Sequence, residues 1–483
     1  MAYPIPQWLI TVFLAAGPLA AVPAAPGSRQ PQENVRAAAD RGGAEVVEMQ
    51  AFRRSGVVSA WLSNGIRVHH RRMDAPPGHV EVVISFAGSE LLECPDTRGL
   101  SLLSAAFLDH PVGNELSAAE GERRLRGRDV HIEGGVMPDA LSVRIWGSAA
   151  DIRAAVDVTA SALRAPHLTD ESLAVARLNA CKAVERTHAD PRWSVTEPLL
   201  DLMTPRGECR TKLACTERLA QYTPDQVKSW IVRHSGSETV EGRPCEVAIV
   251  GDIELTDALR MASQVFGVFP ARPRAAPGAL ADRRCVAKPA GPFIRDVACN
   301  AATRAEETHV LAGFLSPDPC EVQEVRRLRA GARVLSNRLE SRLRELKLGG
   351  DPHVSWTYLP SPFAGMSVTV VSARVIPGDA EPVKQIMQAS MCELMDQGLH
   401  ADELARSTEM LARVAAAYER DPRYWAAILA RSTSAGLDPE LVAEGAMFYR
   451  ALKPDEVLAA MRRACTLENR LDLVVRPGPQ AAE

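Results

Sequence analysis

The sequence predicts an α+β protein built from two tandem copies of one unit, each a mixed, largely antiparallel sheet with helices on one side. Three observations support this class. The chain has 483 residues, 46% hydrophobic and 24% charged, which is an ordinary globular balance and enough length for more than one domain. Strand-like and helix-like segments alternate, with hairpin-like strand pairs among them, as in α+β folds. Short motifs also recur in one order at almost constant spacing, which indicates a duplication.

The repeat is clearest in the stretch HADPRW, with Asp190, which returns as ERDPRYW, with Asp421, 231 positions later. Four further pairs keep the same order in both copies. They are ALSVRIW and GMSVTVV, aligned at Ser142 and Ser367; LTDESL and LHADEL, from Leu168 and Leu399; TPDQV and KPDEV, from Thr223 and Lys453; and the strand-like CEVAIVGD and RLDLVVRP. Five ordered matches are hard to obtain by chance, so we expect two copies of a unit of about 200 residues.

Periodicity predicts the individual elements of the first copy. In chain order they are a half-buried strand over 78–88, a helix from Gly99, a short capped helix over 117–127, a strand over 139–147, and long helices over 149–163 and 170–188. The last helix stops before Asp190-Pro191 because proline cannot continue an ordinary helix. In the second copy, a helical face precedes Asp421-Pro422 in the same way; it consists of Leu404, Thr408, Leu411, Ala415 and Tyr418.

Composition places the domain boundaries. Residues 269–292 are rich in Pro, Ala and Arg and lack periodicity, which is typical of a solvated linker. We therefore expect an N-terminal domain over 50–268 and a C-terminal domain over 293–478. Residues 26–48 are polar and rich in Gly and Ala, and are interpreted as a flexible lead-in.

Residues 1–25 have the pattern of a signal peptide, with a short apolar run, Trp8 to Ala16, followed by small residues. No Lys or Arg precedes the run, so an uncleaved N-terminus is the alternative. The run is much shorter than the ~20 residues that span a bilayer. We expect no membrane span and a periplasmic or secreted protein.

Several function classes are excluded or disfavoured. The net charge is −4, with acidic and basic residues mixed along the chain; without a basic stripe we expect no nucleic-acid partner. The sequence has no P-loop, no G-x-S-x-G and no G-x-G-x-x-G after a strand. Its ten cysteines form no C-x-x-C; Cys209 and Cys215 either close a small disulfide loop or remain buried free thiols. His69 and His70 are adjacent in an expected strand, point to opposite faces, and are not interpreted as ligands.

The duplicated unit, the strand order and the Asp-Pro after each long helix together resemble peptidase family M16, the pitrilysin/insulinase superfamily, in its PqqL-like bacterial branch. The resemblance covers roughly residues 55–478 and rests on diffuse patterns in register with the repeat. They are LSNGIRVHH and AIVGDIELTDALRMASQVFGVFPARP in the first half, and NRLESRLRELKLGG and SPFAGMSVTVVSARVIPG in the second. The resemblance implies a two-lobed clamshell of two α/β-sandwich domains.

The chemistry of that family depends on an inverted zinc motif, H-x-x-E-H, on the helix that begins here at Gly99. Two histidines four apart share a helical face and bind the metal, and the glutamate acts as general base. The motif falls on Leu102, Ala105 and Ala106 in GLSLLSAA. None of these side chains has a lone pair, so we expect no catalytic residue and no metal ligand here, but ordinary core or cavity-lining groups.

The resemblance implies three further positions. A third zinc ligand falls near Glu185, as a possible relic. Arg344 matches an arginine that holds the substrate, although a surface pair with Glu340 or Glu345 is equally compatible with its helix. The matching tyrosine falls on Pro352 and is therefore lost, while Tyr358 is displaced by six residues.

The resemblance thus predicts a non-catalytic homologue without a cofactor. It would serve as a partner or substrate-chamber subunit of a catalytic M16 subunit, form a homo-oligomer, or bind peptides. The alternative is a secreted zinc metalloendopeptidase with unrecognised or partner-supplied ligands, and only that alternative requires zinc. A secreted structural protein outside the family is the remaining possibility.

Overall fold

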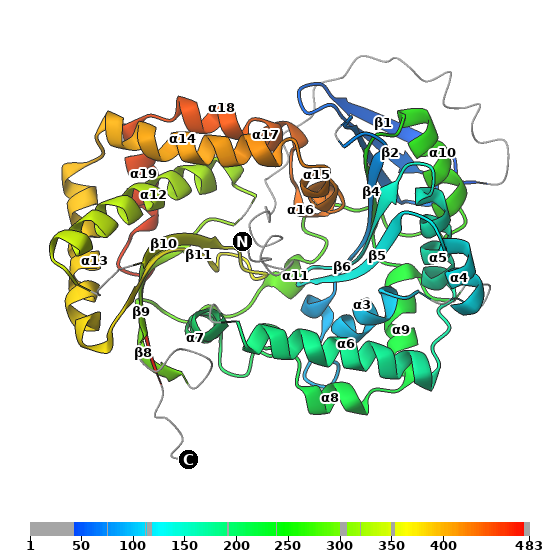
Figure 1. Ribbon diagram of the computed structural model, residues 1–483, viewed down its shortest axis with the longest axis horizontal. Coiled ribbons are helices and arrows are strands. Elements are labelled where there is room, and N and C mark those ends of the chain that lie inside the picture. The colour runs from blue at the N-terminus through cyan, green and yellow to red at the C-terminus, as the bar shows by residue number, and fades with distance from the viewer. Residues whose placement is uncertain are drawn as a thin grey trace.

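The computed structural model describes residues 43–74, 76–111, 113, 118–190, 193–237, 239–299, 307–318, 320–348 and 353–477. The predicted signal peptide, most of the predicted lead-in and Pro352 therefore lie outside the described residues. The chain forms two lobes, each with its own sheet (Figure 1). No helix among the described residues is long and apolar enough to cross a membrane.

The first sheet has seven strands in the order β1-β2-β3-β7-β4-β6-β5. They are β1 (Val46–Phe52), β2 (Val57–Leu62), β3 (Arg67–Arg72), β4 (His79–Ala87), β5 (Val130–Met137), β6 (Ala140–Ser148) and β7 (Cys245–Gly251). Only β3 and β7 pair in parallel. The lead-in prediction is wrong for its last residues, because β1 already begins at Val46, and none of the residues of this strand is fully buried.

The second sheet has five strands in the order β10-β11-β9-β12-β8. They are β8 (Phe293–Cys299), β9 (Thr308–Ser316), β10 (His353–Leu359), β11 (Ser367–Val375) and β12 (Arg470–Pro477). This order repeats that of β5-β6-β4-β7-β3, and its single parallel pair, β12 with β8, matches β7 with β3. The aligned serines agree too: Ser142 lies opposite Ser85, and Ser367 lies opposite Ser316. The predicted fold of two homologous α+β units is confirmed.

Helices cover one face of each sheet. The first unit contains the helices α3 (Leu100–Leu108), α4 (Ala118–Leu125), α5 (Ile152–Arg164), α6 (Asp170–His188), α7 (Trp193–Met203), α8 (Thr216–Gln221), α9 (Pro224–Ser235) and α10 (Leu255–Phe266), and α11 (Ala281–Arg284) lies between the units. Those of the second are α12 (Val322–Glu345), α13 (Ala380–Gln397), α14 (Ala401–Tyr418), α15 (Pro422–Leu429), α16 (Ser432–Ala435), α17 (Pro439–Ala443), α18 (Gly445–Ala451) and α19 (Pro454–Ala464). Capping boxes at Thr169 and Thr223 begin α6 and α9, as the repeated polar turns predict.

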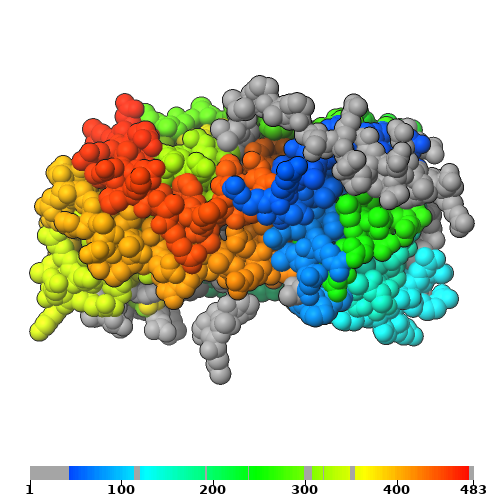
Figure 2. All heavy atoms as spheres, turned by 90° about the horizontal axis from the view of Figure 1, so that it is seen from above, coloured from blue at the N-terminus to red at the C-terminus, as the bar shows by residue number. Residues whose placement is uncertain are grey.

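The other face of each sheet is covered by a helix from the opposite unit. The helix after the first Asp-Pro, α7, packs Leu199 and Met203 into the core on the second sheet. The helix after the second Asp-Pro, α15, packs Trp425 and Leu429 onto Val83 of the first sheet. Figure 1 shows both crossings, and from above the orange segment of the second unit lies directly against the blue strands of the first (Figure 2). Each unit therefore completes the core of the other.

The segment between the units, residues 269–292, is exposed over most of its length, but three of its residues are buried. Phe269 belongs to the first core, and Ala275 is buried. Arg272 is also buried, and its Nη2 donates to the carbonyl oxygen of Ser235 at 2.7 Å. The arginine-rich composition of this segment does not predict such packing. Arg272 can nevertheless be buried, because its guanidinium lies on the ring of Phe269 while it donates to the carbonyl oxygen of Ser235.

Candidate functional site

Helix α3 corresponds to the helix that carries the zinc motif in the family that the sequence resembles, and hydrogen bonds hold it at both ends. Gly99, at its N-cap, has a φ of 99°, a conformation that favours glycine. The buried Glu93 carboxylate accepts hydrogen bonds from the backbone N–H groups of Gly99 (3.0 Å) and Ser101 (2.8 Å), and from Arg98 Nη1 (2.7 Å). The C-terminal end is tied by Asp109, whose Oδ1 accepts from the N–H of Gly134 on β5 at 2.8 Å. Burial raises the pKa of Asp109.

Strand β5 lies in direct contact with the turn of α3 that would carry the motif. A Cβ placed on Gly134 would come within 1.9 Å of the carbonyl oxygen of Ala105. On the same helix, Ser101 Oγ accepts from Trp230 Nε1 of α9 at 3.2 Å. The helix is thus a packed part of the first core rather than the wall of an open cavity.

The three motif positions do not fit a zinc ion. Ala105 and Ala106 are 4% and 8% exposed, and Leu102 packs against the first core. Methyl and isobutyl groups offer no electron pair to a cation, whereas a catalytic zinc needs three protein ligands and an open position. Nowhere in the part of the chain that the structure describes do three or more His, Cys, Asp or Glu residues gather in a way that could hold a metal ion.

Glu185 lies on α6, which packs against α3, but its side chain is exposed. The Cys181 thiol lies one helical turn away from Glu185. Burial raises the pKa of this thiol, and the carboxylates of Glu185 and Glu217 raise it further. Glu185 therefore lies on a helix that packs against α3, but among the described residues it belongs to no group of side chains that could hold a metal ion.

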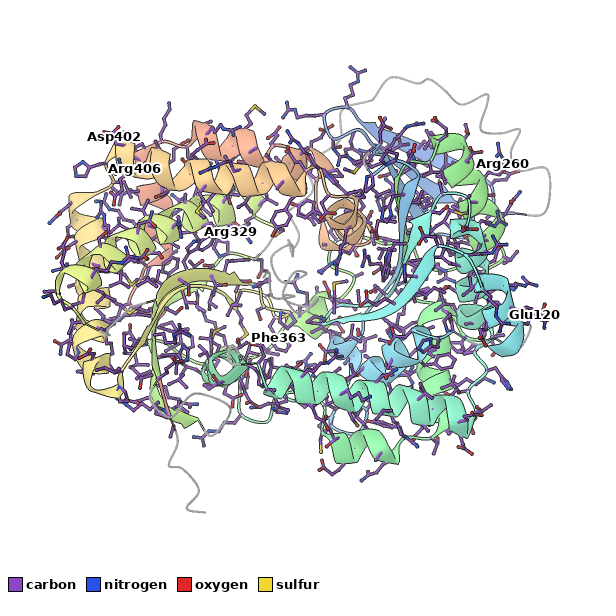
Figure 3. All side chains as sticks on the ribbon, viewed as in Figure 1. Glu120, Arg260, Arg329, Phe363, Asp402 and Arg406 are labelled. Atoms are coloured by element: carbon purple, nitrogen blue, oxygen red, sulfur yellow. The ribbon has the colours of Figure 1, made fainter. Side chains whose placement is uncertain are left out.

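Arg344 lies on the last turn of α12 with its side chain 61% exposed, and its Nη2 is 2.5 Å from Glu340 Oε1. This is the surface pair that its helical spacing allowed. Tyr358, in contrast, is fully buried on β10 and donates its hydroxyl to the carbonyl oxygen of Pro317 at 3.2 Å. The guanidinium of Arg329, a residue labelled in Figure 3, lies over its ring. Burial raises the pKa of Tyr358, so this hydroxyl serves the packing of the second unit.

Sequence reasoning missed a buried polar cluster between the units, which we call the latch: Ser59, His69, Glu246, Thr433 and Ser434. Ser59 Oγ is 2.7 Å from His69 Nδ1, and His69 Nε2 is 3.0 Å from Glu246 Oε2. The Glu246 carboxylate also accepts from the backbone N–H groups of Thr433 and Ser434, both at 2.8 Å, and from Ser434 Oγ at 2.6 Å. A strand of the first unit thereby caps α16 of the second.

The charges in the latch follow from its burial. Burial lowers the pKa of His69, so the imidazole is neutral, donates from Nε2 to Glu246 and accepts at Nδ1 from Ser59. Burial acts to raise the pKa of Glu246, but the hydrogen bonds from His69 and Ser434 outweigh it and hold that pKa below its ordinary value. Ser59, His69 and Glu246 are at most 2% exposed, so this serine, histidine and glutamate have no access to substrate. His70 points to the other face and bonds the carbonyl oxygen of Ile253.

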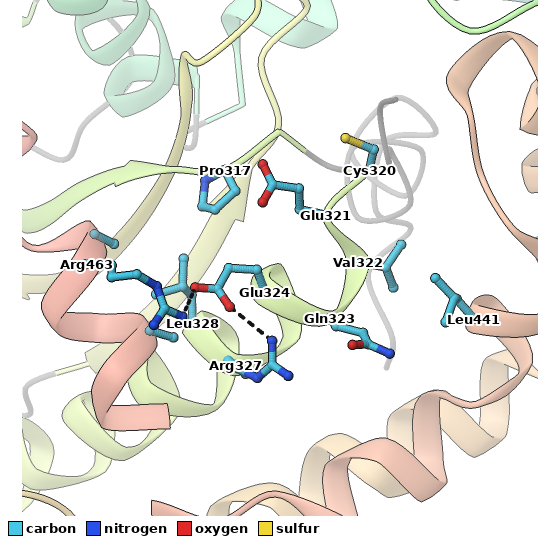
Figure 4. A pocket seen from close by; sticks show the side chains of 12 residues that line it. Pro317, Cys320, Glu321, Val322, Gln323, Glu324, Arg327, Leu328, Leu441 and Arg463 are labelled. Carbon is cyan, nitrogen blue, oxygen red and sulfur yellow. Dashed lines mark hydrogen bonds and ion pairs between the residues drawn. The ribbon is translucent and has the colours of Figure 1, made fainter. Parts of the chain in front are cut away.

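A cavity of about 530 Å³ lies at the start of α12 (Figure 4). The Glu324 carboxylate in its wall is paired, because it bonds Arg327 at 3.1 Å and Arg463 at 2.6 Å. Burial raises the pKa of the lining thiol, Cys320, to about 11, so it is protonated at neutral pH. This thiol is therefore not an activated nucleophile.

Cys209 and Cys215, for which the sequence left a disulfide open, are both free thiols in the structure. The Cys215 thiol instead donates to Glu217 Oε2 at 2.5 Å.

Comparisons with known proteins agree with this architecture. The family model described as the Peptidase M16 inactive domain matches residues 241–411. No curated protein matches the chain by sequence. Among solved structures, the periplasmic protease PqqL from Escherichia coli superimposes with a TM-score of 0.73 at 15% identity, over 95% of this chain and 49% of that one.

Two further structures resemble the chain. A peptidase M16 inactive domain from Pseudomonas fluorescens has a TM-score of 0.70 at 17% identity, over 88% of this chain and 100% of that one. A mutant of the ferredoxin protease FusC, in complex with Arabidopsis ferredoxin, has a TM-score of 0.67 at 14% identity, over 95% and 48%. The chain thus spans about half the length of PqqL and FusC. At these identities the solved structures establish the fold.

Proposed function

This chain belongs to peptidase family M16, and from that premise we propose that it is a non-catalytic member that pairs with a separate, zinc-bearing M16 subunit and forms part of its substrate chamber. The observation that carries the proposal is the chemistry of one helical turn. Leu102, Ala105 and Ala106 occupy the positions at which the family motif has its ligands and base, and none of them binds a cation or moves a proton. No cofactor is part of the proposal.

The missing chemistry supports the choice of a partner. This chain matches about half of PqqL and about half of FusC. A catalytic M16 subunit would supply the metal ligands and the base that Leu102, Ala105 and Ala106 cannot provide, whereas a second copy of this chain would not.

We also propose that the assembly takes peptides or unfolded segments of proteins and works in the periplasm or outside the cell. FusC carries a bound ferredoxin in its solved structure, and PqqL is described as periplasmic. Arg344 is the candidate contact for a peptide carbonyl or carboxylate, since its guanidinium is exposed and pairs with Glu340 at the surface of its own helix.

The experiment combines zinc analysis with native mass spectrometry of the purified chain, alone and mixed with an M16 subunit that has an intact H-x-x-E-H. We expect no stoichiometric zinc in the chain alone, a 1:1 complex in the mixture, and peptide hydrolysis only when the partner is present. One tightly bound zinc per chain together with hydrolysis by the chain alone would establish the alternative, a secreted zinc metalloendopeptidase. A strictly monomeric chain without affinity for peptides would refute the partner role.

A further inference from the structure

Two cysteines of the second unit lie on neighbouring segments of the chain's fold. Cys392 lies on α13, and Cys465 is the residue directly after α19. The two segments run in opposite directions: Arg462 Nη2 bonds the carbonyl oxygen of Met395 at 2.5 Å, and further along Gln388 Nε2 bonds Asp472 Oδ2 at 3.2 Å. A residue between 388 and 395 therefore lies opposite one between 462 and 472.

The helical face supports the same placement. Cys392 follows Gln388 by four residues and precedes Met395 by three, so all three share one face of α13. Met395, on this face, and Cys465 both pack against the core of the second unit, so Cys392 lies at the outer edge of that contact. Burial raises the pKa of the Cys465 thiol, and Cys392 raises it further. Both thiols are free in the structure.

We propose that Cys392 and Cys465 form a disulfide that joins α13 to the end of α19 when the chain is exposed to a disulfide oxidant. The proposal is independent of the M16 partner. In the reaction, the two thiols lose two protons and two electrons to one disulfide oxidant such as glutathione disulfide. Its S–S bond breaks to leave two glutathione thiols, while the Cys392–Cys465 bond forms.

The two thiols have different roles in this exchange. Cys392 is exposed, so it attacks the oxidant and forms the mixed disulfide. Cys465 is only partly exposed and then attacks the Cys392 sulfur to release the second glutathione. Because the raised pKa of Cys465 leaves little thiolate at neutral pH, this second step is slow, and its rate rises about tenfold per pH unit in the neutral range.

The bond would close a loop that contains α14 to α18. This loop includes α15 and α16, the elements that cross to the first sheet and enter the latch. A disulfide at the base of the loop restricts the unfolded chain and ties down both ends of the crossing segment.

The test uses the full chain incubated with glutathione disulfide, blocked with N-ethylmaleimide, and mapped by mass spectrometry. We expect a peptide that links Cys392 to Cys465, and a melting temperature about 5 °C above that of the reduced chain. Cys392→Ser is tolerated at an exposed position and should abolish both. Cys94→Ser, at another exposed cysteine, is the matched control and should preserve both.

Two results would overturn the proposal. In the first, Cys392 and Cys465 both carry the maleimide label in folded, oxidised protein. In the second, Cys392 is linked to a different cysteine. Neither result bears on zinc content or on partner binding, so this proposal and the proposed function fail separately.

Discussion

Substitution of Glu246 by glutamine tests whether the latch holds the two units together. The side chains are nearly the same size, but the amide presents an NH₂ group where one carboxylate oxygen accepts. Whichever way the amide turns, two donors lose their acceptor: either Ser434 N–H and Oγ–H, or Thr433 N–H and His69 Nε2–H. A hydrogen bond to a charged group contributes about 1.5–3 kcal/mol, so the loss of two should lower the free energy of unfolding by about 3–6 kcal/mol.

The assay is urea unfolding followed by tryptophan fluorescence, because Trp425 is buried in the core between α15 and the first sheet. The matched control is Glu393→Gln, at a carboxylate that pairs with Arg342 on the surface at 2.9 Å, where both side chains are about 40% exposed. Its loss should stay within about 1 kcal/mol. Limited proteolysis should also cut the Glu246→Gln protein between residues 431 and 436 more readily. If Glu246→Gln is no less stable than the control, the latch does not hold the units.

Three further changes test the same packing. Acidification should destabilise the protein below about pH 6.5, because His69, like His70, His234 and His309, has a lowered pKa in the folded state and takes up a proton on unfolding. Thermal melts from about pH 7.5 to 5 measure this effect, and His69→Gln should make the loss of stability less steep. Gly134→Ala should cost at least 2–3 kcal/mol in chemical denaturation, because its Cβ would collide with a carbonyl oxygen of α3, whereas Gly378→Ala, with open space around it, should be nearly neutral. Trp425→Ala should cost about 3–5 kcal/mol, and Met447→Ala, which is exposed, should stay within about 0.5 kcal/mol; equal losses would show that α15 adds little to the first sheet.

The duplication could be predicted because each repeated motif is local: an Asp-Pro pair stops a helix wherever it occurs. The destination of the next helix could not be predicted. The amphipathic face of α15 indicates only that Trp425 and Leu429 are buried, and helical periodicity carries no information about which sheet buries them. The repeat does show that α7 and α15 are equivalent helices, and in the structure both pack on the sheet of the opposite unit.

The candidate site divides in the same way. The chemistry at Leu102, Ala105 and Ala106 is a property of the side chains, so it could be predicted once the helix was placed. For Arg344 the sequence left two interpretations open, a substrate contact and a surface ion pair, because helical spacing does not determine which way a long side chain points. Glu246 was visible as a single charge within the apolar strand CEVAIVG, but its partners at 433 and 434 are almost 190 residues away in a segment without pattern. A charge in a buried strand requires a partner, and the sequence does not say where that partner lies.

These observations together explain how the fold persists without metal chemistry on α3. The helix is held by Glu93 and Asp109 at its ends and by direct contact of β5 with the backbone of Ala105, and none of these contacts needs a polar side chain at the motif positions. Its apolar residues add to the first core, where a fully buried leucine contributes about 1.5–3 kcal/mol, while an unpaired buried histidine or glutamate would cost stability. The relative placement of the two sheets depends instead on the crossing helices and the latch. For the proposed function, the shaping of a chamber for a catalytic partner, this placement of the two sheets is what the chain has to provide.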